Sequence, residues 1–327
     1  MSALAPVFTL TPNPSLDETW QVEAFHEDRI NRVDGVRLDP GGKGINVSRL
    51  LRVLGVDAPA AGFAGGENGR ALRKRLVAEG IPDAMTDIAG ETRRNLTLQI
   101  GHEGRTVKIN HPGPEILPAE CRRMADRLEE TLTPGSLLAV CGSLPPGMGR
   151  DEITALLARL SVRGVRICVD CEALDRARLC VIRPFMVKLN QQEFEALVSP
   201  SGPLSGRADV LSTAASLARD TGAIVVVTRG GDGAVAATPE ERRMALAAPP
   251  VGVCSTVGAG DALLGGLLAV YAGWHPDGET GEDDLLARAL RIGVACGAAK
   301  AALPGTDMPM REAVLARYRQ TGHPVPV

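Results

Sequence analysis

The stretch STVGAGDALLGG (residues 255–266) places one acidic side chain at the start of an otherwise apolar helix. The backbone N–H groups of Gly258, Ala259 and Gly260 are predicted to be unpaired there, and a helix N-terminus attracts negative charge. Asp261 would lie beside this anion hole, where its carboxylate can take a proton from a hydroxyl nucleophile. A simpler interpretation is also open: Asp261 only caps the helix, and the glycines only form a turn.

Other glycine-rich or polar stretches open a helix or end a predicted strand. They are DPGGKGINVSRLLRVLG (39–55), CGSLPPG (141–147), VKLNQQE (187–193) and VVTRGGDG (226–233). An open α/β sheet binds its ligands at the carboxyl ends of its strands. Any one of these stretches can be a mere turn, but together with residues 255–266 they predict a single ligand site.

The elements that would position this site alternate between short strands and helices. Apolar strands are predicted at 7–10, 59–65, 136–142, 165–170, 184–190 and 223–231, and helices at 44–55, 69–80, near 151–161 and near 206–219. This order predicts an α/β fold with a mostly parallel sheet covered on both faces. Residues 15–38 and 92–110 break the rhythm, the second as a β-hairpin around GHEG (101–104), so we expect them to form a small separate sheet.

Composition narrows the class of protein. The chain has 327 residues with a formal net charge of −3, and 3% of them are aromatic, so no nucleic-acid patch, stacking platform or polybasic membrane anchor is evident. The N-terminus lacks a signal-peptide pattern, and apolar runs such as AIVVV (223–227) are too short to span a bilayer. We therefore expect one domain, 1–327, that is cytoplasmic and has neither nucleic-acid nor membrane partners.

Histidines and cysteines do not predict a metal site. Cys168 and Cys171 form a lone C-x-x-C without a second pair, so we interpret them as reduced cysteines at the end of a buried strand. The histidines show no ligand spacing: they are His26, His102, His111, His275 and His323. A histidine-based catalytic triad or metal centre is not expected.

Over essentially its whole length the sequence resembles the ribokinase-like PfkB carbohydrate kinase family, and within it the phosphofructokinase branch. GGKGINVSRLLRVLG (41–55) resembles the N-terminal signature, STVGAGDALLGG the C-terminal signature, and NQQE (190–193) the N-x-x-E element. The resemblance implies a three-layer α/β/α fold, with ATP and Mg²⁺ as cofactors. It also implies that about 15–38 and 92–110 form a β-sheet lid over the sugar, often used for homodimerisation.

The resemblance assigns roles by position. Asp261 would be the catalytic base and Gly258, Ala259 and Gly260 the anion hole. The sugar phosphate would be bound by Asp17, Arg29, Gly42, Lys43, Asn46, Arg93 and Ser143. The ATP side would comprise Lys188, Asn190, Glu193, Thr228, Gly230 and Gly233, with Glu193 organising Mg²⁺ and phosphate indirectly. In-line phosphoryl transfer needs such positioning and charge stabilisation, and arginine suits a phosphate dianion.

Two positions depart from the family pattern. Leu189 replaces the proline of the usual Lys-Pro-Asn, and Gln192 stands where phosphofructokinase relatives often have lysine. We expect nucleotide binding to survive the first change, because both polar groups are kept.

Two sequence stretches favour different ketohexose phosphates as the substrate. GGKG (41–44) is more similar to fructose-1-phosphate and tagatose-6-phosphate kinases, and TRRNLTL (92–98) to minor 6-phosphofructokinases. We favour fructose 1-phosphate, converted to fructose 1,6-bisphosphate, with fructose 6-phosphate or tagatose 6-phosphate as alternatives. The cations Arg29, Lys43 and Arg93 argue against an unphosphorylated substrate, although Arg29 and Arg93 could also simply form a solvated lid face. The intact element 258–261 argues against a non-catalytic sugar-phosphate sensor.

Overall fold

The computed structural model describes residues 4–101, 105–198, 206–276 and 284–326. Within these ranges the main sheet has ten strands in the order β14-β13-β12-β11-β10-β9-β8-β1-β4-β5. The strands from β11 to β5 run parallel, and β12, β13 and β14 add an antiparallel edge. The predicted α/β fold with a mostly parallel sheet is confirmed.

The strands of the main sheet are short and apolar. They span β1 (Val7–Thr11), β4 (Ala60–Ala64), β5 (Asp83–Asp87), β8 (Leu137–Cys141), β9 (Arg166–Asp170), β10 (Met186–Asn190), β11 (Ile224–Thr228), β12 (Ala234–Ala237), β13 (Arg243–Leu246) and β14 (Val325–Pro326). Leu138 and Val140 of β8 pack into one core, and Leu137 and Ala139 into the other. A strand buried on both faces is therefore a continuous apolar run.

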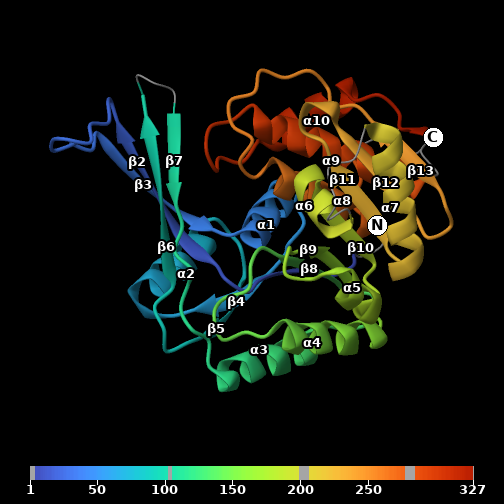
Figure 1. Cartoon of the computed structure of the whole chain (residues 1–327), viewed down its shortest axis with the longest axis horizontal. Helices are drawn as coiled ribbons and strands as arrows, with labels where there is room; N and C mark the ends of the chain where they lie inside the picture. The colour runs from blue at the N-terminus through green and yellow to red at the C-terminus, as the bar shows by residue number, and fades with distance from the viewer. Residues whose placement is uncertain (1–3, 102–104, 199–205, 277–283, 327) are drawn as a thin grey trace.

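Helices cover both faces of the main sheet, which gives three layers (Figure 1). One face carries α3 (Pro118–Thr131), α4 (Arg150–Val162), α5 (Arg176–Ile182), α6 (Gln191–Val198) and α7 (Arg207–Thr221). The other carries α1 (Lys43–Val53), α8 (Ala259–Tyr271), α9 (Leu285–Ala301) and α10 (Arg311–Gln320). Helix α2 (Gly66–Ala78) packs near β4 and β5, where Leu72 and Leu76 contact a third core.

A separate four-stranded sheet stands beside this body, on the left in Figure 1. Its order is β3-β2-β6-β7, from β2 (Ser15–Val22), β3 (Gly35–Gly41), β6 (Arg93–Ile100) and β7 (Arg105–Ile109). The small sheet expected from residues 15–38 and 92–110 is thus present. Most of the predicted hairpin tip, residues 102–104, lies outside the described residues.

The two faces of this second sheet differ in chemistry because side chains alternate along each strand. One cross-strand row, here called the outer row, consists of Val36, Trp20, Leu98 and Val107. The neighbouring row, which points to the opposite face, consists of Arg37, Thr19, Thr97 and Lys108. Thr19, Thr97 and Lys108 line the cleft between this sheet and the body, so the polar face is turned toward the body and the outer row away from it.

The helix predictions differ from the structure mainly at the ends. The helix expected at 44–55 is α1, and Gly55, which follows its last turn, has φ +81°. The final hundred residues contain α8, α9 and α10, but also β12 and β13, whose short sequences AVAA and RMAL show no clear alternation. In the described part of the chain, no helix is long and apolar enough to cross a membrane.

Candidate active site

A cleft of about 1600 Å³ lies between the second sheet and the loops at the carboxyl ends of the main strands. Predicted site residues that line it are Asp17, Gly42, Lys43, Asn46, Arg93, Ser143, Gly258 and Asp261. They come from the second sheet, from the first turns of α1 and α8, and from the loop after β8. The strand-end stretches thus meet where an open α/β sheet is expected to bind ligands.

The start of α8 is open to an anion. Gly258 is the N-cap in the left-handed conformation, with φ 75°, and no side chain caps the helix. Among the described residues, the N–H groups of Gly258 and Gly260 have no hydrogen-bond partner. The N–H of Ala259 donates to the carbonyl of Thr256 at 3.2 Å, so our prediction that it is unpaired is wrong, because the preceding turn folds back on it.

Asp261 lies in the first turn of α8 and is only 7% exposed. Its Oδ2 accepts a hydrogen bond from Nδ2 of Asn46 at 2.8 Å, so it does not cap the helix itself. Burial and the negative charge of Asp170 raise the pKa of Asp261 to about 6, although Lys188 and Asn46 oppose the shift. A buried carboxylate with a raised pKa is suited to act as a general base near neutral pH.

A chain of alternating charges connects the cleft with the end of β10. The ammonium of Lys188 lies 2.7 Å from Oδ2 of Asp170, and that of Lys43 lies 3.1 Å from its Oδ1. Lys43 also donates to Oε1 of Glu193 at 2.9 Å. Burial opposes the charge of Asp170, but Lys188 and Lys43 outweigh it and hold the pKa of Asp170 below its usual value.

Asp170 is a functional candidate that the sequence patterns did not single out. It stands between the two cysteines of CVDC and is fully buried at 0% exposed. Both cysteines are free and buried, as expected. A carboxylate at the end of a predicted buried strand was the available signal, since such a group needs a cationic partner.

The N-x-x-E element has a structural role in its own right. The side chain of Glu193 accepts from the N–H of Asn190 at 2.8 Å, and the side chain of Asn190 accepts from the N–H of Glu193 at 2.9 Å. This reciprocal pair is a capping box that begins α6 directly after β10. It orients the Glu193 carboxylate toward Lys43. Leu189 is buried within β10, so the missing proline leaves the strand intact.

The far end of the cleft is built around Asp17 and Arg93. Oδ1 of Asp17 accepts hydrogen bonds from Ser15 at 2.6 Å and from Asn95 at 3.0 Å. The Arg93 guanidinium donates to the carbonyl oxygens of Asn13 at 2.7 Å and His111 at 2.8 Å. Burial lowers the pKa of Arg93, and the charge of Asp17 opposes this.

Several buried polar atoms in this cleft have no partner within the described chain. They are Oγ1 of Thr11, Oδ1 of Asn46 and Nε of Arg93. Unsatisfied buried polar groups are rare in folded proteins. Three of them in one cleft indicate that it is shaped for a polar ligand. Thr11, Asn95, Lys108 and Arg150 also line the cleft and were not among the predicted site residues.

Other predicted residues lie outside this cleft. Arg29 is in the connection between β2 and β3, contacts His26 at 3.1 Å, and its side chain is 65% exposed. This connection projects from the body, so Arg29 does not reach the cleft of its own chain. On the ATP side, Thr228 is the register neighbour of Asn190 across β11 and β10. Gly230 and Gly233 follow β11, and a Cβ at Gly233 would lie 2.0 Å from the carbonyl oxygen of Leu246.

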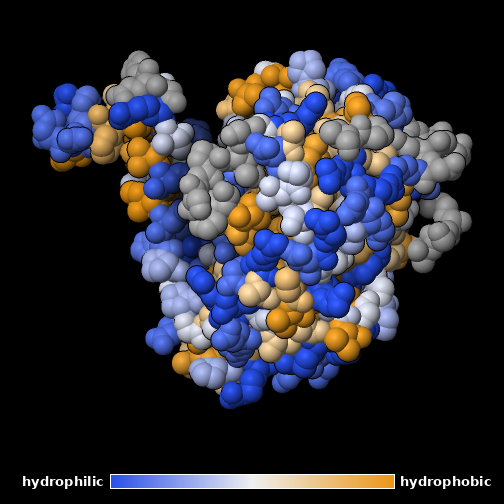
Figure 2. Space-filling model, turned by 45° about the vertical axis from the view of Figure 1, so that its right-hand side comes forward, coloured by the Kyte–Doolittle hydropathy of each residue, from blue (hydrophilic) through white to orange (hydrophobic). Residues whose placement is uncertain are grey.

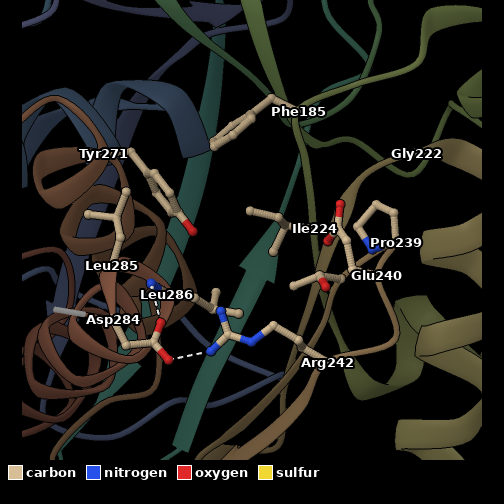
Figure 3. A pocket seen from close by; sticks show the side chains of 11 residues that line it. Phe185, Gly222, Ile224, Pro239, Glu240, Arg242, Tyr271, Asp284, Leu285 and Leu286 are labelled. Carbon is tan, nitrogen blue, oxygen red and sulfur yellow. Dashed lines mark hydrogen bonds and ion pairs between the residues drawn. The ribbon is translucent and has the colours of Figure 1, made fainter.

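A second pocket, of about 740 Å³, lies at the other end of the strands, near the starts of β10 and β11 (Figure 3). Phe185 and Tyr271 form one wall, with ring centroids 4.9 Å apart, and Ile224 lies beside them. Arg242 pairs with Asp284, which is also the N-cap of α9. These two charged groups are thus already paired, and no predicted site residue lines the pocket.

Comparisons with known proteins agree with this geometry. The chain belongs to the pfkB family of carbohydrate kinases, whose family model matches residues 11–313. It is therefore an ATP-dependent sugar kinase, and its fold is ribokinase-like, as the resemblance implied: the structure of a ribokinase from Thermotoga maritima has a TM-score of 0.73 at 18% identity, covering 97% of this chain and 99% of that one.

Individual relatives cover most of the chain. A protein of Rhodobacter capsulatus described as 1-phosphofructokinase is 33% identical over 263 residues, which is 80% of this chain and 82% of that protein. The structure of phosphofructokinase-2 from Escherichia coli in complex with substrates and products has a TM-score of 0.87 at 32% identity, covering 96% of this chain and 99% of that one. The same protein in complex with fructose-6-phosphate has a TM-score of 0.86 at 30% identity, covering 97% and 99%.

Proposed function

We propose that this kinase transfers the γ-phosphoryl group of ATP to the free primary hydroxyl of a ketohexose monophosphate, and that its main substrate is fructose 1-phosphate. The observation that carries the proposal is the cleft itself. It has a buried base, Asp261, beside a helix N-terminus that no side chain caps, and a half-buried cation, Arg93, at its far end. This arrangement fits a sugar that already carries one phosphate and presents a hydroxyl to the base.

The chemical step follows from the geometry at α8. The Asp261 carboxylate accepts the proton of the sugar hydroxyl as the hydroxyl oxygen bonds to the γ-phosphorus of ATP. The bond between that phosphorus and the β,γ-bridging oxygen breaks, and ADP leaves with the electron pair. The N–H groups of Gly258 and Gly260 stabilise the negative charge on the transferred group. Asn46 orients the base through its 2.8 Å hydrogen bond.

The far end of the cleft would bind the phosphate that the sugar brings. Nε of Arg93 is buried and unpartnered, and its other nitrogens are held by carbonyl oxygens. A fixed guanidinium loses little entropy when it binds a phosphate dianion. Asp17 and Asn95 would bind sugar hydroxyls, with Ser143 on the opposite wall of the cleft.

ATP and Mg²⁺ would be held near the ends of β10 and β11. No described group of three or more His, Cys, Asp or Glu side chains can hold a metal alone. Mg²⁺ bound to ATP usually keeps several waters and needs only one or two carboxylates. Glu193 and Asp170, whose charges are shared with Lys43, fit that requirement. When bound, Mg²⁺ would neutralise phosphate charge, and Lys188 and Lys43 would do the same from the protein side.

A homodimer through the second sheet is part of the same proposal. In the outer row, Val36 is 58% and Val107 41% exposed, and Ile109 of β7 is 53% exposed on the same face. Figure 2 shows hydrophobic residues on the part of the molecule that projects from the body. A second copy would bury this face. Light scattering on the wild type and on Val36→Lys tests this: the variant is expected to shift to monomer, and an unchanged mass contradicts the interface.

The substrate is tested by ADP release with fructose 1-phosphate, fructose 6-phosphate, tagatose 6-phosphate and fructose. We expect kcat/KM to be highest for fructose 1-phosphate and at least about 100-fold lower for fructose, because the unphosphorylated sugar brings no anion to the guanidinium and leaves Nε of Arg93 without an acceptor. Asp261→Asn serves as the control for contaminating kinases. Phosphosugar binding without turnover on any substrate would indicate a sensor.

Fructose 6-phosphate is the second candidate. The Escherichia coli relative is described in complex with it, and its chain is 30% identical to this one. A ketohexofuranose has a CH₂–O group at each end of its ring, so the two monophosphates present similar shapes to one cleft. A higher kcat/KM for fructose 6-phosphate would make this protein a 6-phosphofructokinase and leave the kinase mechanism unchanged.

A further inference from the structure

Lys300 is a buried cation that the phosphoryl transfer described above does not use. It lies in the last turn of α9, and its side chain is fully buried, at 0% exposed. Its ammonium donates to the carbonyl oxygen of Gly305 at 2.9 Å. In the part of the chain that the structure describes, it forms no ion pair within 4.0 Å. A buried ammonium without a paired carboxylate is costly, so its position calls for a reason.

The side chain lies directly behind the start of α8. A Cβ placed on Gly258 would be 3.5 Å from Cε of Lys300 and 3.9 Å from Oδ2 of Asp261. The residues that precede α8 are hydrogen-bonded to Ala301, the residue of α9 that follows Lys300. The N–H groups of Cys254 and Ser255 both donate to the carbonyl oxygen of Ala301, at 2.8 and 3.1 Å. Lys300 is thus in the layer immediately behind the anion hole.

The turn that Lys300 holds, residues 303–307, also connects the body with the second sheet. The Arg37 guanidinium of β3 donates to Oδ1 of Asp307 at 2.6 Å and to Oγ1 of Thr306 at 2.7 Å. Oγ1 of Thr306 donates to Asp39 at 3.1 Å, and its carbonyl accepts from Arg49 at 2.9 Å. The turn lines the cleft, so its position affects the space in which the substrates meet.

Groups of both charge signs act on the pKa of Lys300. Burial disfavours the ammonium and lowers the pKa of Lys300, and Arg49 acts in the same direction, whereas the carboxylates of Asp307 and Asp261 oppose the shift. The Gly305 carbonyl can accept a hydrogen bond but cannot donate one, so it favours the protonated form of Lys300. The positive charge of Lys300 therefore acts on the α8 N-terminus without being neutralised by a close carboxylate.

We propose that Lys300 is a positioning residue for phosphoryl transfer: its ammonium fixes the turn 303–307 and adds a positive charge behind the anion hole at the start of α8. The inference rests on the proposed function. A charge fixed in a water-excluded region stabilises a developing anion more than it does in water. Because Lys300 is buried and does not line the cleft, its effect should be smaller than that of a group in direct contact with the phosphoryl group.

The test variant is Lys300→Met, which keeps the length of the side chain and removes the charge. We expect kcat to fall by roughly 10- to 100-fold. This decrease is no larger than the decrease in kcat that follows removal of one direct oxyanion-hole donor. The KM values for ATP and the sugar phosphate should change by less than about threefold, because the charge acts mainly on the transition state. Binding of MgADP with aluminium fluoride, a mimic of the transferred phosphoryl group, should weaken by a similar factor, while ATP binding stays unchanged.

Arg291→Met is the matched control. Arg291 is a buried cation on the same helix, its guanidinium 4.3 Å from the ring of Tyr318 and hydrogen-bonded to the Tyr318 hydroxyl at 3.0 Å. This variant should lower Tm without a specific loss of aluminium fluoride binding. In Lys300→Ala, added methylammonium should restore part of kcat, whereas tetramethylammonium, which has no N–H to donate to the Gly305 carbonyl, should not.

Three results would overturn the inference: an unchanged kcat in Lys300→Met, a lower kcat with normal binding of the aluminium fluoride complex, or no methylammonium rescue of Lys300→Ala. The second would mean that Lys300 only maintains structure. The rescue experiment also decides the matter if Lys300→Met does not fold. Failure of the proposed function is distinguishable, because the wild-type protein would then turn over no sugar phosphate at all.

Discussion

Helices α8 and α9 begin near opposite ends of the main-sheet strands, and each has an aspartate at its start, in the first turn of α8 and at the N-cap of α9. Asp284 is the N-cap of α9: its side chain accepts from the N–H groups of Leu286 at 3.1 Å and Ala287 at 3.2 Å. Burial opposes its charge, but those N–H groups and Arg242 keep the pKa of Asp284 below its usual value. Asp261 makes no such contact, and its pKa is raised to about 6.

The two aspartates differ in whether they occupy the N–H groups at the start of their helix. Asp284 satisfies the N-terminus of α9 with its own oxygens, and in the pocket of Figure 3 it is paired with Arg242. At α8 the cap is a glycine without a side chain, and the carboxylate is turned toward Asn46. The helix N-terminus and the base both stay available to a ligand. A helix start becomes a reactive site only when nothing in the chain satisfies it first.

The largest expected effect is on Asp261. Asp261→Asn should lower kcat by about 1000-fold or more, because an amide cannot accept the hydroxyl proton. Sugar-phosphate binding, measured by calorimetry, should stay within a fewfold of wild type. Near-normal turnover would contradict the role of Asp261 as the base.

The same variant should be more stable than wild type at neutral pH. The pKa of Asp261 is raised by the fold, so its ionisation destabilises the folded state as pH rises through about 6. A shift from 3.8 to about 6 corresponds to about 3 kcal/mol at most, and the uncharged amide of the Asp261→Asn variant would avoid that cost. Thermal unfolding at pH 8 and pH 5 checks this: the gain in Tm should shrink at the lower pH.

Arg93 comes next. Arg93→Ala should raise KM for the sugar phosphate by roughly 10- to 100-fold and leave KM for ATP nearly unchanged, because a charged hydrogen bond to phosphate is lost. Arg94→Ala is the matched control: Arg94 is the adjacent residue but contacts Glu18 and Asn68 instead of the cleft. Equal effects of Arg93→Ala on both KM values would remove Arg93 from the phosphate site.

The pH dependence of kcat/KM follows from the same contrast. Because only the ionised Asp261 can accept a proton, activity should be full above pH 7 and fall about tenfold per unit below its pKa of about 6. A profile measured between pH 4.5 and 8.5 tests this, with circular dichroism as the control for unfolding. Activity that stays flat down to pH 4.5 would contradict a buried, desolvated base.

The smallest expected effect is at the other helix start. Asp284→Ala should cost about 1 kcal/mol in the free energy of unfolding, because two N–H groups lose their acceptor. Its depressed pKa means that this stabilisation is present at neutral pH and is lost as pH falls below about 4. Turnover should be unchanged. A kinetic defect in this variant would show that the two helix starts are coupled.

Local features of the sequence determined much of this outcome. Apolar strands alternating with amphipathic helices predict the layers, and glycine-rich turns at strand ends predict the edge that carries the site, because periodicity and turn chemistry are properties of neighbouring residues. The motif that contains Asp261 predicted a reactive carboxylate beside an anion hole. The polar and apolar faces of residues 15–22 and 93–100 follow from simple alternation.

Only the tertiary structure decided which distant groups meet. The strand order brings Asp170 to Lys43, 127 positions away, and so ties the sugar side of the cleft to Glu193. Packing of α9 against α8 places the ammonium of Lys300 behind Gly258, although nothing near Lys300 in the sequence suggests a site. Arg29, which the sequence placed at the sugar phosphate, does not line the cleft of its own chain and contacts His26 instead. These contacts depend on how elements far apart in the chain pack, which no local pattern records.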